Sequence, residues 1–578
     1  MIKLPKAPIW FLVIAYFLTS FQGFAAINKK EVSYEFLNND SPITDFIDTS
    51  VFASENLNEK ISLPNSGHLD IFFSGEKTRL RILLDHYSMA KNPRMKITQL
   101  PMLKFDFIVD QNYLVPRIQN VQRSDHPYWE WQVSPGRFWK TPGDRGFTRV
   151  AFPFSLQEKN ANCTHNGLLL FLMNEQGETS NGVFQIASET CAYLQFDLAG
   201  RVEVDYESKI DIEDKALKEY FKKAIAEKIV WEPVERLTKK YPKLNIKNLL
   251  PPQPLDSTIS GLVIDGEHYS LNCGTRHGKF PYCDWMALPS YSTAKSIFAG
   301  IGYMRLQKLV PNIERLLVTK IIPECSKQKW ENVTLSDLIN MRTGNYLSKG
   351  AHGDEGSDRM TKFFLSTTHQ DKLDLACNMF PHKAKPGKVF KYHTSDTYLA
   401  GVMLDRVFEK VSDQSDFYQS VLANDLWFRL GLSPLLNVSK RTYDKDNQAF
   451  AGWGLTYYTD DILKIGHFLQ QQKTATGEKL LLDKKLLASA MQQFSATNNR
   501  EGGEPNLAYN NGFWALEVGS VLGCKKPYWI PFMSGFGGIT VALISDNIIY
   551  YNFSDNHQYL WLNIVKELNK QFAICEAT

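Results

Sequence analysis

The sequence lacks the residue patterns that mark the common zinc sites. Its eight cysteines never occur in the spacing Cys-x-x-Cys, and its 12 histidines never form His-Glu-x-x-His. A structural or catalytic zinc site built on either pattern is therefore not predicted. An excess of one charge is missing as well, because 65 Lys and Arg face 62 Asp and Glu, which leaves a net charge of +3. A near-neutral chain argues against nucleic acid as a partner.

Internal repeats and low-complexity tracts are absent too. The chain has 578 residues, of which 43% are hydrophobic and 13% are aromatic. These values exclude a disordered or collagen-like chain, and they allow a sizeable core. The length is more than one domain usually needs, so we expect at least two domains.

Long apolar runs are confined to the N-terminus. Lys3 and Lys6 precede an apolar stretch at 10–21, and Gly23-Phe24-Ala25 supplies small residues before a cut after Ala25. This pattern predicts a signal peptide over 1–25 and a secreted or periplasmic protein. The alternative is an uncleaved membrane anchor, although the apolar stretch is shorter than the ~20 residues that a spanning helix needs. We expect no stable membrane span after cleavage.

Export makes disulfides the expected state of the cysteines. Their even number suits complete pairing in an oxidising compartment. Spacing alone allows 105 pairings for eight cysteines. The nearest neighbours, Cys163 with Cys191 and Cys273 with Cys283, are the leading candidates, and the other pairs stay open.

The chain changes character twice. Short apolar runs separated by Gly, Pro, Asn and Asp predict a β-rich N-terminal domain over 27–205, organised as a β-sandwich. Charged residues with helical spacing follow at 206–254 and predict a helical linker, which Pro251-Pro252 ends. From 255 to 578, strand-like and helix-like segments alternate, so the fold class predicted for the whole chain is α+β.

The most informative segment is ALPSYSTAKSIFAGIGYMRLQKLVP at 287–311, where Ser292 and Lys295 form Ser-x-x-Lys. On a helix these positions lie on one face, one turn apart, so the lysine amine can reach the serine hydroxyl. Serine is a weak nucleophile until a base takes its proton, and lysine can be that base if burial lowers its pKa. The alternative reading of Ser292 is an ordinary helix N-cap.

The pattern Ser-x-x-Lys occurs at three other places. Only Ser292 opens a long amphipathic helix, with Ile297, Ile301 and Met304 at helical spacing, before Pro311 stops it. We therefore discount the remaining pairs, which are Ser74/Lys77, Ser88/Lys91 and Ser326/Lys329.

Residues 255–575 resemble the serine β-lactamase and penicillin-binding-protein-like family, in particular its class C-like hydrolases and esterases. No single motif is decisive, but seven segments occur in family order. They are ISGLVIDGEHYSLNCG (259–274), YSTAKS (291–296), NVTLSDLINMRTGNY (332–346), FKYHTSDTYLAGVML (390–404), FAGWGLTYYTDDILKIGHFLQ (450–470), NGFWALEV (511–518) and FMSGFGGITVALI (532–544). The resemblance implies an antiparallel sheet flanked by helices, the transpeptidase-like fold.

The resemblance also implies roles for particular residues. Tyr392 matches the tyrosine of Tyr-x-Asn and would partner Lys295 as phenol or phenolate. Thr394 stands where the family often has Asn, and it either replaces that side chain or caps the helix that follows. A second match, Tyr509-Asn510-Asn511, is out of family order and is discounted.

The family's substrate strand aligns with Met533-Ser534-Gly535. The N–H groups of Ser292 and Phe536 would form the oxyanion hole, and Ser534 would bond substrate. Gly535 fits a strand against which substrate lies. Met533 replaces the cation that binds a substrate carboxylate in β-lactamases and D,D-peptidases, which shifts the expectation towards neutral esters or amides.

We therefore predict an exported serine hydrolase that acts on a small-molecule or peptide-like ester or amide, without metal or organic cofactor. Two alternatives are a β-lactamase or D,D-peptidase, and an inactive binding protein on the same scaffold. A third is a glycan-binding role for the N-terminal domain, since Trp129, Trp131 and Trp139 either stack on sugars or pack in the core.

The acidic loop at 351–360 has two readings. It contains Asp354 and Glu355, which either bind a cationic group of the substrate or belong to a solvated loop. His352 in the same loop either lies near the site or is structural.

Overall fold

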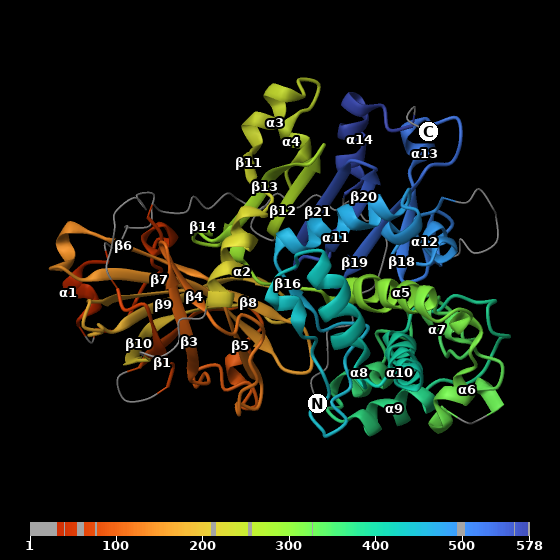
Figure 1. The fold of residues 1–578 in the computed structure, drawn as a ribbon, viewed down its shortest axis with the longest axis horizontal. Helices are drawn as coiled ribbons and strands as arrows, with labels where there is room; N and C mark the ends of the chain where they lie inside the picture. Colours follow the sequence, from red (N-terminus) through yellow and green to blue (C-terminus); the bar gives the residue numbers. More distant parts are fainter. Residues whose placement is uncertain are drawn as a thin grey trace.

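We describe the fold from a computed structural model of the chain (Figure 1). The structure describes residues 32–39, 41–54, 63–74, 78–209, 215–251, 257–325, 328–493, 503–559 and 561–575. The predicted signal peptide at 1–25 lies outside the described residues, as do Lys77 and Ser326 of the discounted pairs. Among the described residues, no helix has the length and apolarity that crossing a bilayer demands.

The first ten strands form one antiparallel sheet rather than two. In spatial order it runs β1 (Ser66–Phe72), β3 (Leu103–Asp110), β4 (Tyr113–Pro116), β6 (Gly136–Lys140), β7 (Thr148–Glu158), β8 (Thr164–Met173), β9 (Gly182–Thr190), β10 (Phe196–Ser208) and β2 (Arg79–Asp85), and β5 (Trp129–Val133) pairs with β7.

The predicted β-sandwich is corrected by the pairing of β10. The first half of this 13-residue strand pairs with β2 on one side and β9 on the other, while its second half, over 203–208, pairs with β1. Because β1 also pairs with β3, the sheet closes on itself around one apolar core. Sequence periodicity shows which residues alternate between faces, but it does not show which strands meet at the ends of the sheet.

The second sheet is built from two distant stretches of chain. Its order is β11 (Trp231–Pro233), β13 (Glu267–Thr275), β12 (Ser257–Ile264), β21 (Ile548–Ser554), β20 (Ile539–Ser545), β19 (Trp529–Gly535), β18 (Phe513–Glu517) and β17 (Leu507–Asn510), with β14 (Gly278–Lys279) beside β13. All of these pairs are antiparallel except β11 with β13. The strands β12 and β13 form a hairpin that turns at Asp265-Gly266, where both residues have positive φ, as a type I′ turn requires.

Helices cover both faces of this sheet (Figure 1). Alternate residues of β12 divide between the faces, because Val263 packs with the helices α5 (Ile301–Leu309) and α11 (Thr459–Gln472), while Leu262 and Ile264 pack with α14 (Leu562–Phe572). The helical layer also includes α10 (Thr394–Val411). Helices around an antiparallel sheet confirm the predicted α+β class.

The segment between the sheets is partly helical. It contains α2 (Lys215–Ala226), α3 (Val234–Lys240) and α4 (Ile246–Leu249), but β11 lies between α2 and α3 and joins the second sheet. The predicted helical linker over 206–254 is therefore wrong for 206–208, which end β10, and for 231–233, which form β11. The domain boundaries themselves stay predictions.

All eight cysteines form disulfides. The two predicted pairs, Cys163–Cys191 and Cys273–Cys283, are confirmed, and the other two are Cys325–Cys377 and Cys524–Cys575. Four disulfides are typical of proteins outside the cytosol.

Candidate active site

The predicted nucleophile helix is continuous but changes its pitch. A 3₁₀ turn, η6 (Tyr291–Thr293), leads into a π-helical segment, η7 (Lys295–Gly300), and then into α5. Ser292 is half-buried, and Lys295 is 2% exposed. The Nζ atom of Lys295 donates a hydrogen bond to Ser292 Oγ at 2.8 Å. The spacing of Ser292 and Lys295 thus brings the lysine amine to the serine hydroxyl. The N-cap of this turn is Ser290 and not Ser292.

Burial determines the protonation of Lys295. Its ammonium also donates to Thr394 Oγ1 at 2.8 Å and to the Gly452 carbonyl at 3.2 Å. Loss of solvent lowers the pKa of Lys295 from 10.5 to about 8, although the Glu355 carboxylate pulls in the opposite direction. About one lysine in ten is then neutral at pH 7, so a free amine is available as a base.

Tyr392 faces the same hydroxyl. It lies two residues before the start of α10 and is 9% exposed, and it is close enough to Ser292 for the serine hydroxyl to act on the pKa of its phenol. Lys295 Nζ lies 4.9 Å from the centre of its ring. Burial first, and then the Glu355 carboxylate, raises the pKa of Tyr392 well above 10. Tyr392 is therefore a neutral phenol, and the phenolate alternative is disfavoured.

Thr394 connects the lysine to a carboxylate. It is the first residue of α10, after the N-cap His393, and its hydroxyl bonds Lys295 and Glu355, which disfavours the capping alternative. Instead, the Thr394 hydroxyl accepts from Lys295 and donates to Glu355, whose second oxygen accepts from the Thr394 backbone N–H at 2.8 Å. Sequence reasoning offered Glu355 only as a ligand for a cation or a solvated group, and did not foresee this contact.

The acidic loop is held by a buried ion pair. Asp354 is 2% exposed and accepts from the backbone N–H groups of Leu347 and Ser348, both at 2.8 Å, and from His393 Nε2 at 3.1 Å. Burial alone would lower the pKa of His393, but Asp396 and Asp354 raise it to about 9, so the imidazole is charged. The solvated-loop reading is therefore wrong for Asp354, which fixes the backbone next to Glu355.

His393 was missed by sequence reasoning, although it stands between Tyr392 and Thr394. The only signal in the sequence was its position, because His393 stands between two residues of the motif that the resemblance identifies. His352 lies near the site, because its ring centre is 5.4 Å from that of Tyr392.

The expected substrate strand passes the nucleophile turn. Ser534 and Gly535 end β19, and a Cβ on Gly535 would come 2.9 Å from the carbonyl oxygen of Ser290. The close approach of the Ser290 backbone thus requires glycine at position 535. Met533 is fully buried in the core, so this position presents no cation. Phe536 is 44% exposed, which leaves its ring at the surface of the site.

Phe536 contacts one residue next to Ser292 and one residue next to the first sheet. Its ring centre is 5.8 Å from that of Tyr291 and 6.1 Å from that of Tyr193, which precedes β10 of the first sheet. Phe536 therefore contacts a residue outside the segment that resembles the hydrolase family.

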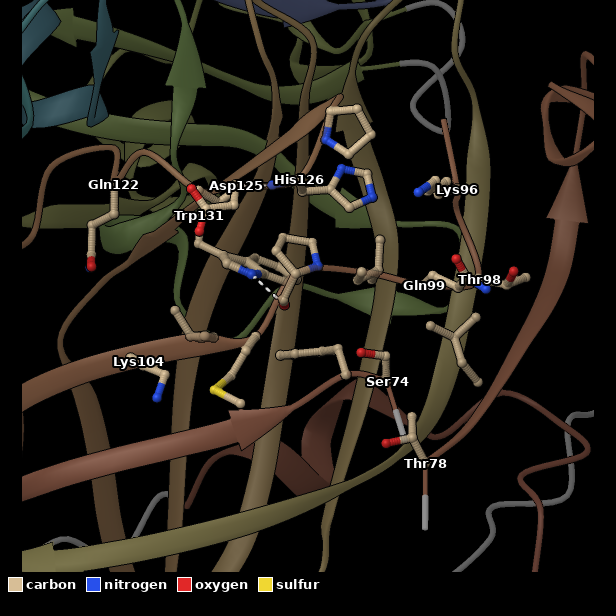
Figure 2. Close-up of a pocket in the computed structure, with 18 of the residues that line it drawn as sticks. Ser74, Thr78, Lys96, Thr98, Gln99, Lys104, Gln122, Asp125, His126 and Trp131 are labelled. Atoms are coloured by element: carbon tan, nitrogen blue, oxygen red, sulfur yellow. Dashed lines mark hydrogen bonds between the residues drawn. The ribbon is translucent and has the colours of Figure 1, made fainter. Parts of the chain in front are cut away.

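A cavity of about 920 Å³ lies in the first sheet and is separate from Ser292 (Figure 2). Figure 2 shows Lys96 and Lys104 on opposite sides of it, with Trp131 between them. The Trp131 indole N–H donates to the Pro101 carbonyl at 2.8 Å. The three tryptophans singled out for glycan stacking are at most 5% exposed, which favours the core-packing reading. Within the described ranges, no three His, Cys, Asp or Glu side chains form a group that could hold a metal ion.

No sequence profile of a known family matches the chain, and no curated protein sequence matches it. Several solved structures are similar in fold. A putative 6-aminohexanoate-dimer hydrolase from Bacillus anthracis has 15% identity and a TM-score of 0.41, over 56% of this chain and 80% of that one. The hydrolase EstCE1, with promiscuous acyltransferase activity, has 14% identity and a TM-score of 0.41, over 54% and 94%.

A class C β-lactamase has 11% identity and a TM-score of 0.39, over 64% of this chain and 98% of that one. The names of these structures are those of the family that the sequence motifs predict. TM-scores of this size carry no argument about the reaction, which has to be derived from the side chains of the site.

Proposed function

We propose that this protein is an exported serine hydrolase that cleaves an ester or amide through an acyl-enzyme on Ser292. The observation that carries the proposal is the buried Lys295 amine, 2.8 Å from Ser292 Oγ, with a pKa of about 8. A serine beside a neutral lysine is an activated nucleophile, whereas a capping serine needs no such neighbour. The contact of Ser292 with the Tyr392 phenol adds a second route for the same proton.

The reaction begins when the neutral amine of Lys295 takes the proton of Ser292 Oγ. The oxygen forms a bond to the substrate carbonyl carbon, and the carbonyl electrons move to its oxygen. The N–H groups of Ser292 and Phe536 receive this oxyanion. When the intermediate collapses, the bond to the leaving group breaks, and that group takes the proton from Lys295 through the Tyr392 hydroxyl. Water then attacks the acyl ester by the same route, releases the acid and restores Ser292.

The substrate class follows from the strand beside the nucleophile. A buried methionine at position 533 cannot make a charge-assisted bond to a substrate carboxylate. We therefore infer substrates whose acyl part is neutral at this end, and we rank β-lactamase or D,D-peptidase activity below esterase or amidase activity. The intact contacts among Ser292, Lys295 and Tyr392 disfavour an inactive binding protein.

The proposal is tested by labelling the purified protein with a fluorescent fluorophosphonate and mapping the labelled peptide. We expect one adduct, on Ser292, and none in Ser292→Ala. Ser88→Ala is the matched control, because Ser88 also belongs to a Ser-x-x-Lys pair but is exposed in the turn that follows β2. Label that persists in Ser292→Ala, or well-folded wild-type protein that takes no label, would overturn the proposal.

Glu355 gives the proposed mechanism a pH signature. Its carboxylate raises the pKa of Lys295, so Glu355→Gln should lower that pKa and extend labelling to lower pH. The measurement is the labelling rate between pH 5 and 10, in which the midpoint of the acidic limb should fall below that of the wild type. Asp358→Asn is the control, since it removes an exposed carboxylate three residues away. An unchanged midpoint in Glu355→Gln would contradict this role.

A further inference from the structure

The side chain of Asn162, from the loop between two strands of the first sheet, contacts the turn that leads to Ser292. Asn162 lies between β7 and β8 and is 1% exposed. Its Oδ1 accepts from the backbone N–H of Tyr291 at 2.7 Å, from Ser290 Oγ at 3.0 Å and from the backbone N–H of Gly454 at 3.1 Å. Its Nδ2 donates to the Leu455 carbonyl at 3.3 Å. The Asn162 carboxamide therefore joins Tyr291, the residue before Ser292, to the loop that contains Gly454 and Leu455.

The backbone at this point needs such support. Tyr291 has a φ of +40°, a left-handed conformation that a residue with a bulky side chain rarely adopts. Conformations of this kind persist where surrounding contacts hold them, and they cluster at functional sites. Here the bond from the Tyr291 N–H to Asn162 fixes the Ser290–Tyr291 peptide, which leads into this strained residue directly before Ser292. Ser290 adds to the same connection, because its N–H donates to the Leu455 carbonyl at 2.9 Å and its hydroxyl accepts from the Leu455 N–H at 3.0 Å.

The position of Asn162 is itself constrained. The next residue, Cys163, is fully buried and forms a disulfide with Cys191, which directly follows β9. The Thr164 hydroxyl donates to the Asn162 carbonyl at 3.1 Å. The two parts of the molecule also meet nearby, where Thr456 of β16 (Thr456–Tyr457) donates to Gln157 of β7 at 3.1 Å (Figure 1). The backbone of Asn162 is therefore held in place by the neighbouring disulfide and by the bond from Thr164.

We propose that Asn162 is a positioning residue for Ser292, so that the first sheet completes the nucleophile site of the second. This inference rests on the proposed serine hydrolase function and extends it to the chain outside 255–578. Asn162 touches neither Ser292 Oγ nor Lys295 in the contacts of the described residues. It acts by holding Ser290 and the Ser290–Tyr291 peptide, and thereby the strained conformation of Tyr291 from which Ser292 Oγ and its backbone N–H are directed.

A second asparagine, four residues further along the chain, provides a matched control. Asn166 of β8 is 2% exposed and also bridges the two parts, since its Nδ2 donates to the Ala287 carbonyl and its Oδ1 accepts from the Ala287 N–H, both at 3.0 Å. Ala287 lies five residues before Ser292, ahead of the nucleophile turn. Asn166→Ala therefore weakens the contact between the parts without removing a bond to Tyr291 or Ser290.

The experiment compares full-length wild type, Asn162→Ala, Asn162→Asp and Asn166→Ala. For each we would measure the maximal rate of fluorophosphonate labelling, its pH midpoint and the melting temperature. Small misplacements of a reacting group cost up to about a hundredfold in rate. We expect Asn162→Ala to label about 10- to 100-fold more slowly, with an unchanged pH midpoint, because the burial of Lys295 and its bonds to Thr394 and Gly452 stay intact. Asn166→Ala should lose comparable melting temperature and keep its labelling rate.

Asn162→Asp distinguishes positioning from folding. Its carboxyl group retains the three acceptor bonds, and in the protonated form, which burial and the facing Leu455 carbonyl favour, it can also donate to that carbonyl. It should therefore recover most of the rate, including in the case where Asn162→Ala does not fold. Equal labelling rates in Asn162→Ala and Asn166→Ala, or a rate in Asn162→Asp as low as in Asn162→Ala, would overturn the inference. Failure of the wild type to label would instead refute the hydrolase function on which it rests.

Discussion

Lys295→Met is expected to slow the acylation of Ser292 by about a thousandfold or more. Methionine has nearly the length of lysine and suits a buried position, so the change removes the base and leaves the volume of the site almost intact. A positioned general base contributes roughly 10²- to 10⁴-fold to such a step. Loss of the amine also removes the bonds to Ser292 and Thr394, which leaves the serine hydroxyl with its ordinary low reactivity.

The wild-type pH profile provides an independent check on the same base. The form of Lys295 that accepts a proton is the neutral amine, which dominates above its pKa of about 8. Labelling should therefore rise with pH through a midpoint near 8 and fall about tenfold for each pH unit below it. In Lys295→Met this limb should disappear, because the group that titrates is gone.

Lys372 supplies the matched control. It is also a fully buried lysine, and burial lowers its pKa to about 7, but its amine donates to the carbonyls of Phe363 and Phe364. Lys372→Met should retain the labelling rate of folded protein and the same pH midpoint. If Lys295→Met labels within tenfold of the wild type, Lys295 is not the base and the mechanism is wrong.

The sequence predicted the centre of the site better than its surroundings. Ser292 and Lys295 share one helix, so three residues of spacing suffice to place them together. Tyr392 came from the order of motifs along the chain, which periodicity alone could not have provided. Two of the four disulfides were predicted from nearness in sequence. The pairs Cys325–Cys377 and Cys524–Cys575, with separations of 52 and 51 residues, were not.

The missed features depend on contacts between distant segments. Glu355 meets Thr394 only because Asp354 and His393 bind each other across 39 residues, and composition alone makes that loop look solvated. Asn162 meets Tyr291 across 129 residues, and nothing in its local sequence marks it. The closed first sheet has the same cause, since the β1–β10 pairing joins strands more than 100 residues apart. Local sequence patterns therefore identified Ser292 and Lys295, whereas contacts between distant segments determine their positions and the pKa of the lysine.

Tyr392→Phe is expected to slow the hydrolysis of alkyl esters and amides by about 10²- to 10³-fold, within the usual range for a proton donor. The reason is the fate of the leaving group. An alkoxide or amide anion cannot depart at neutral pH without a proton, and in the proposed mechanism that proton passes through the Tyr392 hydroxyl. The raised pKa of Tyr392 keeps the phenol protonated, as this role requires.

A nitrophenyl ester with the same acyl group separates this role from a general loss of structure. Nitrophenolate is a stable anion and leaves without a proton, so Tyr392→Phe should slow its release far less than that of the alkyl ester. Tyr509→Phe is the control, because Tyr509 belongs to the discounted Tyr-x-Asn match and its ring lies 6.4 Å from that of Tyr392. It should change neither rate by more than a few fold. An equal loss on both esters in Tyr392→Phe would show that the phenol acts before the leaving group departs, at the attack of Ser292, and the proton route would then run from Lys295 alone.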